Sequence, residues 1–531
     1  MLFNSYEFIF AFLPLTLLGF FLLGRWGKQR AAIAWLVLAS LFFYGWWNPP
    51  YLILLILSIV LNFLLGGWLA RSVARPVGSR RLVLGLGVAA NLASIGYFKY
   101  ANFFIDNLNA VGGTDYHLET IILPLAISFF TFQQITFLID SYRGQTTENS
   151  FLNYCLFVSF FPQLIAGPIV HHSEMLPQFA QAKIFRFRPG NITVGLTIFA
   201  LGLFKKAVLA DGIAVYANPV FDAADTGQVF TFLEAWTGAL AYTFQLYFDF
   251  SGYSDMALGA ARMFGIRLPM NFNSPYKATS IIEFWRRWHI TLSRFLRDYV
   301  YIELGGNRKG PVRRHINLLA TMLIGGLWHG AGWTFVAWGA LHGFYLIVNH
   351  AWHWLRRRLN GGTVPDSTFA GRLVGWLVTM IAVIVGWVFF RATTFDGAIN
   401  ILTGMAGMNG VALPAAIGVH FAGLADILRD LGVIFTPGGG ERFVTGWSWV
   451  IALSVIAFLF PNSLDLTRRY RPALYYRFDG ATPKSWLATP LHTLAALRWR
   501  PGVAWAMLIA VFATGGILAL PQVSDFLYFQ F

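Results

Sequence analysis

One histidine of the chain stands in a stretch that is otherwise apolar and loosened by glycine. This residue is His329, within LIGGLWHGAGW at positions 323–333. An imidazole near its ordinary pKa can act as a base, bind a metal ion or cap a buried carbonyl. Ionisable residues in membrane-type sequence are functional candidates by default. His329 is therefore the first candidate for chemistry, and a packed structural histidine is the alternative.

A second imidazole, His289, lies in the stretch EFWRRWHITLSRFLRDYVY at positions 283–301. At helical spacing, one broad side of this stretch is apolar: Trp285, Trp288, Leu292, Phe295, Leu296 and Tyr299. The remaining positions are rich in arginine: Arg286, Arg287, Arg294 and Arg297. This pattern predicts one amphipathic helix that lies in a membrane interface. A lipid-surface helix without a chemical role remains the alternative reading.

Two carboxylates stand in a third apolar and aromatic run, QLYFDFSGYSDMA at 245–257. Burying a carboxylate is costly unless a partner compensates its charge. Asp249 and Asp255 are six positions apart, so they point to different sides of a helix and each needs its own partner. Arginines of the 283–301 helix are the candidate partners. A structural ion pair and a role in substrate binding both remain open.

The motifs of several other chemistries are absent from the sequence. There is no HExxH, no GxSxG nucleophile elbow, and no Walker or dinucleotide-binding fingerprint. Neither His350 and His353 nor His171 and His172 stand with a carboxylate at metal-ligand spacing. We therefore expect no metal centre.

The composition shows what must position these residues. Of 531 residues, 56% are hydrophobic and only 12% are charged, and the mean hydropathy is +0.57. A bilayer crossing takes about 20 apolar residues. Candidate apolar runs cover 8–24, 31–47, 51–70, 82–104, 121–139, 151–170, 192–216, 232–258, 318–355, 371–390, 447–460 and 503–520. These runs predict an all-α, polytopic integral membrane protein. The 151–170 run, broken by Pro162 and Pro168, is expected to dip in and return.

The net charge of +15 is concentrated in short loops between these runs. The basic clusters are Arg25, Lys28 and Arg30; Arg71, Arg75, Arg80 and Arg81; Arg356, Arg357 and Arg358; and Arg468, Arg469 and Arg471. Cytoplasmic loops of membrane proteins carry this excess of cations. The placement argues for loops against anionic lipid and against nucleic-acid binding. It also places the N-terminus outside.

The run that contains His329 has basic sequence at both ends, so it must cross an even number of times. Its 38 residues, 318–355, reach about 57 Å as helix, whereas two crossings of the bilayer core need about 60 Å. We therefore expect a short, compressed helical pair with its break at HGAGW. Residues 393–446 are expected to form an outside region with short helices, and 461–500 a basic cytoplasmic loop. We expect one integral-membrane domain over 1–531.

Three stretches carry a resemblance, in this order: YFDFSGYSDMA, NFNSPYKATSIIEFWRRWHITLSRFLRDYVYIELGGNRKG and GGLWHGAGWTFVAWGALHG. They resemble the membrane-bound O-acyltransferase family, and within it the bacterial alginate-type polysaccharide acetylases. GYFKYANFF, LPLAISFFTFQQITFLID and FFPQLIAGPIV are similar as well. The resemblance covers roughly residues 1–390.

The resemblance implies a ring of helices around a thinned centre, with a funnel from outside and a donor entrance from inside. It places the family's catalytic histidine at His329 and a second histidine at His289. A neutral imidazole can take the proton of a hydroxyl as the oxygen attacks a thioester. His329 is the candidate base, and His289 orients the acceptor or stabilises the oxyanion. The candidates for substrate binding are Asp249, Asp255, Arg286, Arg287, Trp285 and Trp328.

The same resemblance implies an enzyme of the bacterial inner membrane. Its expected donor is acetyl-CoA at the cytoplasmic face, a substrate rather than a bound cofactor, whose phosphates arginines would meet. The expected acceptor is a hydroxyl of an exported polysaccharide, alginate-like, cellulose or another glycan. The acetyl group would pass directly or through a serine of a periplasmic partner, alongside a polysaccharide synthesis and export complex. A transporter or flippase that performs no bond chemistry is the rival hypothesis.

Overall fold

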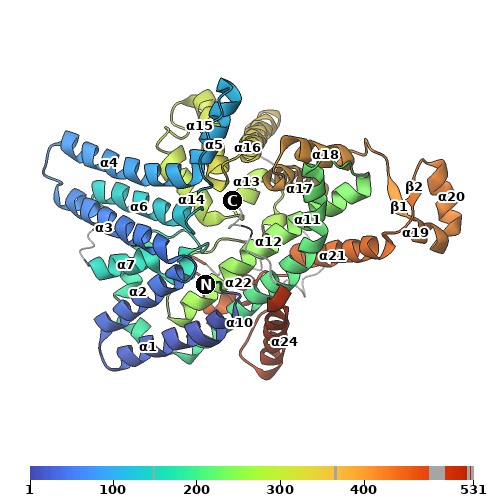
Figure 1. Cartoon of the computed structure of the whole chain (residues 1–531). Helices are drawn as coiled ribbons and strands as arrows, with labels where there is room; N and C mark the ends of the chain where they lie inside the picture. The colour runs from blue at the N-terminus through green and yellow to red at the C-terminus, as the bar shows by residue number, and fades with distance from the viewer. Residues whose placement is uncertain (147–149, 364–366, 477–496, 523–526, 528–531) are drawn as a thin grey trace.

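The computed structural model describes residues 1–146, 150–363, 367–476, 497–522 and 527. Helices make up most of this part of the chain (Figure 1). Its strands β1 (Ala412–Pro414) and β2 (Ile434–Thr436) pair in parallel. The expectation of an all-α protein is therefore confirmed.

Long apolar helices identify a multi-pass membrane protein. In the described residues, six helical stretches are long and apolar enough to cross a membrane: Glu7–Arg25, Pro49–Arg71, Val77–Gly112, Pro189–Asp225, Phe369–Arg391 and Gly440–Leu459. Two shorter apolar helices, α2 (Gln29–Gly45) and α24 (Val503–Ala519), accompany them. Eight of the predicted apolar runs fall on these helices, and the runs 121–139, 151–170, 232–258 and 318–355 are not among them.

The first part of the chain forms the blue and cyan side of Figure 1. Its elements are η1 (Glu7–Phe12), α1 (Leu13–Arg25), α2, α3 (Pro49–Arg71), α4 (Val77–Ile95), η2 (Gly96–Tyr100), α5 (Ala101–Gly112), α6 (Ile127–Tyr142), α7 (Phe151–Ser159), α8 (Phe161–Leu164), α9 (His172–Phe179) and η3 (Ala182–Phe185). Helix α7 has nine residues, about 14 Å of helix, and the chain breaks at Phe160. No described helix of the 151–170 run is long enough to cross a membrane, and its dipping in and returning stays a prediction.

Helix α12 (Phe232–Met263) lies at the centre of the bundle (Figure 1). It packs against α10 (Pro189–Phe204), which continues through η4 (Lys205–Ala210) into α11 (Asp211–Asp225). Glycines bring the two backbones together: a Cβ on Gly202 would stand 2.6 Å from the Gly252 carbonyl oxygen, and one on Gly259 2.6 Å from that of Gly195. Small residues allow such close packing between membrane helices.

The carboxylates of α12 pair with lysines rather than with the predicted arginines. Lys206 Nζ lies 2.6 Å from Asp249 and 2.9 Å from Asp211, and Lys205 Nζ lies 2.8 Å from Asp255. The expectation of arginine partners was wrong because the turn η4 brings both lysines to α12. The lysines lie far from these carboxylates in the sequence, so the sequence did not indicate the pairing. The expectation of a separate partner for each carboxylate is confirmed.

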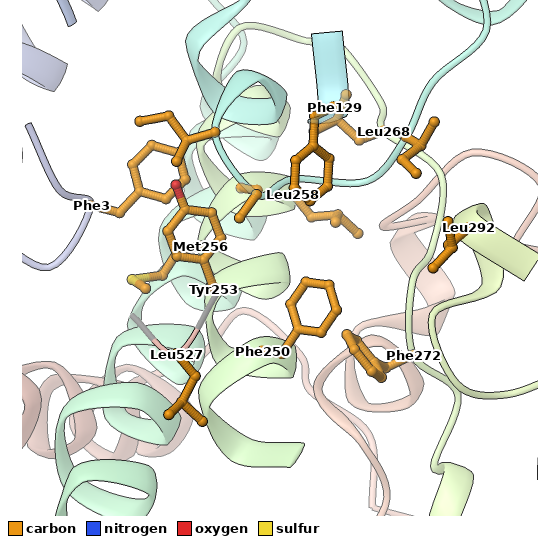
Figure 2. Packing of buried hydrophobic residues seen from close by; sticks show 14 of the residues in the cluster. Phe3, Phe129, Phe250, Tyr253, Met256, Leu258, Leu268, Phe272, Leu292 and Leu527 are labelled. Atoms are coloured by element: carbon orange, nitrogen blue, oxygen red, sulfur yellow. The ribbon is translucent and has the colours of Figure 1, made fainter. Parts of the chain in front are cut away.

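Aromatic and aliphatic side chains surround α12 on its other sides (Figure 2). The Phe250 ring meets Phe272 at a centroid distance of 4.9 Å, and Tyr253 stacks on Phe3 at 4.8 Å. The segment that follows α12 therefore wraps back onto it. Phe250 therefore faces the segment that contains His289.

The stretch 283–301 is not one continuous helix. It forms α13 (Ile281–Trp285), α14 (Ile290–Leu296) and η6 (Arg297–Tyr301), with η5 (Pro275–Lys277) before them. His289, at the break between α13 and α14, has a left-handed backbone with φ of 40°. The apolar side chains of α13 and α14 are buried in the core. The prediction of a single lipid-surface helix was wrong, because this apolar side packs inside the protein.

His329 ends α15 (Gly310–His329), and α16 (Trp333–Leu359) begins after three intervening residues. The predicted break at HGAGW is confirmed. The pair is not compressed, however: α15 has 20 residues, about 30 Å of helix, because it starts within the basic flank at Gly310. A Cβ on Gly339 would stand 2.5 Å from the Met322 carbonyl oxygen, so the two helices are in close contact.

The remaining described elements are α17 (Phe369–Arg391), α18 (Phe395–Met405), β1, α19 (Ala415–His420), α20 (Ala422–Asp430), β2, α21 (Gly440–Leu459), α22 (Ser463–Leu466), η7 (Arg468–Tyr470), α24 and η9 (Leu520–Gln522). Short helices in 393–446 agree with the prediction. The three-residue strands were too short to recognise. Of the expected loop 461–500, residues 477–496 lie outside the described residues. The domain boundaries remain a prediction.

Candidate active site

Three helices surround the His329 imidazole, which is 4% exposed. Its ring lies edge-on to Trp328 of α15 at 4.9 Å, Trp338 of α16 at 5.1 Å and Phe390 of α17 at 5.1 Å. Gly330, directly after it, is extended with φ −156° and ψ 150°. The helix thus ends at the residue whose side chain enters this aromatic surround.

The second predicted histidine lies beside the first. The ring centroids of His289 and His329 are 6.4 Å apart, and His289 is fully buried. Phe250 of α12 lies 4.8 Å from the His289 ring and Trp328 lies 6.1 Å from it. We call His289 and His329 the histidine pair.

A hydrogen bond fixes which nitrogen of His289 carries the proton. Its Nδ1 lies 3.2 Å from Oδ1 of Asn271, and that oxygen also accepts from the Thr291 hydroxyl at 2.7 Å. The Thr291 backbone N–H, which can only donate, also points to this atom at 3.3 Å, so the atom is the amide oxygen and His289 donates to it through Nδ1–H. In the neutral ring Nε2 then carries a lone pair. His289 can accept a hydrogen bond there without changing its charge.

A cavity of about 310 Å³ reaches His329. It is lined by Met1, Leu2, Trp47, Lys99, residues 123–129, Ile165, Trp328 and His329. The segment 123–129 leads into α6, and in the topology expected from the loop charges it lies on the outer side. A substrate in this cavity can touch His329.

A stack of aromatic rings leads away from the pair towards a polar cluster. Trp328 stacks on Phe132 at 5.4 Å, Phe132 on Phe295 at 4.0 Å, Phe295 on Tyr299 at 5.4 Å, and Tyr299 on His171 at 5.6 Å. We call these five rings the aromatic stack. It follows α6 from the histidine pair towards the end of that helix at Tyr142.

The polar cluster at the far end of the aromatic stack is held by charged hydrogen bonds. The Tyr299 hydroxyl donates to Asp140 at 3.0 Å, and Arg294 binds both carboxylate oxygens of Glu174, at 2.5 and 3.1 Å. Burial, with the nearby Arg294 cation adding to it, lowers the pKa of His171 below its ordinary value. His171 is therefore neutral at neutral pH, beside a fixed ion pair.

The structure brings together three of the predicted site residues, His329, His289 and Trp328. Trp285 is one ring further out: it contacts Trp338 at 5.8 Å, and Trp338 contacts His329. The others lie apart from the pair. Asp249 and Asp255 pair with the lysines of η4; Arg287 pairs with Glu283 at 2.7 Å, and Arg286 is exposed.

Sequence reasoning missed three polar residues around the pair, Asn271, Lys99 and His342. His342 is fully buried on α16, accepts a hydrogen bond from Trp285 Nε1 at 3.3 Å, and lies 4.9 Å from Trp338. It stands in GALHG, four positions after Trp338. That spacing puts both on one face of α16 and was the available signal.

Among the described residues, no group of three or more His, Cys, Asp or Glu could hold a metal ion.

Comparison with known proteins identifies the class to which this fold and site belong. The model of the membrane-bound O-acyltransferase family matches residues 140–387, which include both histidines. A peptidoglycan O-acetyltransferase of Helicobacter pylori is 48% identical over 439 residues, 78% of this chain and 81% of the relative. The chain belongs to the membrane-bound O-acyltransferase family and is an acyltransferase.

Two further relatives extend the comparison. A Pseudomonas putida protein named "Probable alginate O-acetylase AlgI" is 38% identical over 544 residues, the whole of both chains. A teichoic acid D-alanyltransferase of Streptococcus thermophilus is 27% identical over 287 residues, 51% of this chain and 69% of the relative. The resemblance read from the sequence is therefore confirmed at the level of the family.

Proposed function

We propose that this acyltransferase moves an acetyl group from acetyl-CoA to hydroxyls of an exported polysaccharide, with His329 as general base. The observation that carries the proposal is the position of His329, which lies in the wall of the 310 Å³ cavity and also beside His289. A hydroxyl that enters the cavity meets His329 as the base, and His289 lies beside that imidazole as a hydrogen-bond acceptor.

The transfer uses the histidine pair as follows. The acceptor hydroxyl attacks the thioester carbonyl while His329 takes its proton, so an ester bond forms, the carbon–sulfur bond breaks and coenzyme A leaves. The imidazolium returns the proton to the departing thiolate. Asn271 holds Nδ1–H of His289, so neutral His289 offers a lone pair and not a donor to the reacting atoms. Of its two expected roles, orienting the acceptor is therefore favoured over stabilising the oxyanion.

The donor is expected to approach from the opposite side to the acceptor. The aromatic stack and its polar cluster lie on the side that the loop charges assign to the cytoplasm, which supports entry of acetyl-CoA there. Arg286 is exposed, so its guanidinium can meet a phosphate. Arg287 already binds Glu283.

The names of the relatives support a glycan acceptor. Peptidoglycan and alginate, in the names of the Helicobacter and Pseudomonas relatives, are both exported polymers with sugar hydroxyls. We propose that this chain serves an acceptor of the same class at the bacterial inner membrane, together with a polysaccharide synthesis and export complex. The acetyl group reaches the sugar directly or through a serine of a periplasmic partner.

The experiment measures base-labile acetate on the exported polymer in cells that carry variants at matched protein abundance. His329→Ala and His329→Gln should both abolish acetylation, since a base contributes about 10²–10⁴ in rate and glutamine cannot take a proton at neutral pH. A structural histidine would tolerate glutamine. Near-normal acetylation by His329→Gln would refute the assignment of the base.

Membrane vesicles prepared from the same cells distinguish acyl transfer from transport. With radiolabelled acetyl-CoA outside inverted vesicles, an acyltransferase forms acetyl esters and releases coenzyme A in equal amounts. A transporter without bond chemistry would instead accumulate intact label in the lumen, and its rate would not depend on His329.

A further inference from the structure

The end of α15 receives side-chain hydrogen bonds on three consecutive carbonyls. Tyr100 donates its hydroxyl to the Leu327 carbonyl at 2.6 Å. Lys99 Nζ donates to the carbonyls of Trp328 at 2.6 Å and His329 at 3.0 Å. The last carbonyls of a helix lack partners within the helix, and in a buried setting they need partners from elsewhere.

Both donors come from one unusual turn. Lys99 and Tyr100 belong to η2, a π-turn inside the long apolar stretch Val77–Gly112. The neighbouring residue Tyr97 is exposed instead. Single π-turns within helices are rare and are frequent at functional sites. Here the turn lets two adjacent residues reach the same helix end.

The carbonyls that these side chains hold belong to the site. Trp328 and His329 are the residues whose rings contact each other and His289. Lys99 also lines the cavity that reaches His329. A cation at the C-terminal end of a helix is favourable as well, because the helix dipole is negative there.

We infer that Lys99 is a positioning residue for catalysis, with Tyr100 as its accessory. By holding the carbonyls on either side of the His329 Cα, it fixes where α15 ends and hence the direction of the imidazole. This inference rests on the proposed role of His329 as base. Lys99 would act on the orientation of the His329 imidazole after the substrates have bound. Its loss should therefore lower kcat and leave the binding of the donor unchanged.

The test compares variants in inverted membrane vesicles with varied acetyl-CoA concentration. Lys99→Met keeps most of the side-chain length but removes all donors; its kcat should fall about 100-fold, the scale of a 1 Å misplacement, with KM for acetyl-CoA unchanged. Lys99→Arg keeps a cation with several donors and should recover about tenfold. Tyr100→Phe removes one hydrogen bond and should lower kcat about fivefold. Tyr97→Phe, on the same turn but exposed, should leave kcat unchanged.

Wild-type kcat in Lys99→Met, or equal loss in Lys99→Met and Lys99→Arg, would overturn the inference. If Lys99→Met does not accumulate, Tyr100→Phe decides: a fall in kcat at normal abundance supports the inference and a normal kcat overturns it. His329→Gln is measured in parallel. If that variant is inactive while Lys99→Met is normal, only this inference fails; if it is active, the proposed function fails.

Discussion

The imidazoles of His289 and His329 lie 6.4 Å apart, although one directly precedes α14 and the other ends α15. Each is placed by a local break in the backbone: a left-handed residue at His289 and an extended glycine after His329. Asn271 fixes the proton of one ring. The two rings are therefore chemically different partners rather than duplicates.

Asn271→Leu should lower acetylation about tenfold without lowering protein abundance in proportion. The substitution removes the acceptor for His289 Nδ1–H, a hydrogen bond of about 1 kcal/mol, and lets the other tautomer form. Acetate per milligram of membrane protein is the measurement. Asn62→Leu is the matched control, because it removes a buried amide that pairs with Asn91 and belongs to a part of the sequence far from both histidines. Equal activity losses in the two variants would point to general destabilisation.

Arg286→Gln and Arg287→Gln should differ. Arg286 is exposed, and its loss should raise KM for acetyl-CoA severalfold if its guanidinium meets the phosphates. Arg287 binds Glu283 and the Asn273 carbonyl, so its loss should lower protein abundance and leave KM close to normal. Initial rates at varied donor concentration distinguish them. A normal KM in Arg286→Gln would remove this arginine from the donor site.

Lys206→Met should strongly destabilise the protein. It leaves Asp249 and Asp211 without their shared cation, and breaking one side of a buried ion pair costs about 3–5 kcal/mol. The melting temperature in detergent should fall by several degrees. Adding Asp249→Asn removes one uncompensated charge and should restore part of the loss. If the double variant melts below the single one, the ion pair is not the source of the effect.

Gly339→Ala should disturb the contact between α15 and α16, because its Cβ would stand 2.5 Å from a backbone oxygen that cannot move aside. We expect loss of acetylation together with a lower melting temperature. Gly85→Ala, on the membrane helix α4 with open space around it, is the control and should behave like the wild type. Normal activity in Gly339→Ala would mean that the helix pair can separate without moving His329.

The orientation of the chain is tested by accessibility. Single cysteines in a Cys155→Ser background should be labelled from outside at positions 106–117 and from the cytoplasm at positions 71–81 and 356–358. A cytoplasmic signal from 106–117 would invert the expected topology. The cavity beside His329 would then face the donor side, and the routes of donor and acceptor would exchange.

Much of the fold was readable from the sequence because lipid imposes simple rules. Runs of apolar residues became helices, and the glycines of HGAGW became the break after His329. The pairing of Asp249 with Lys206 was not readable, since a π-turn decides which residues face α12.

The same limit applied to the site. The apolar side of 283–301 was identified correctly but assigned to lipid, because periodicity does not tell protein from lipid as the apolar neighbour. Lys99 was missed for a related reason, since it acts on His329, 230 positions away, and Asn271 was missed because only the fold of the segment between them turns it towards His289.

The lysines of η4 also constrain how the chain is made. Lys206 has one carboxylate, Asp211, within its own segment, whereas the carboxylate that pairs with Lys205, Asp255, and the second partner of Lys206, Asp249, arrive only when α12 has been synthesised. A lone ammonium inside a membrane-spanning segment is costly. The nascent segment 189–225 should therefore wait at the insertion machinery or beside a chaperone until α12 joins it.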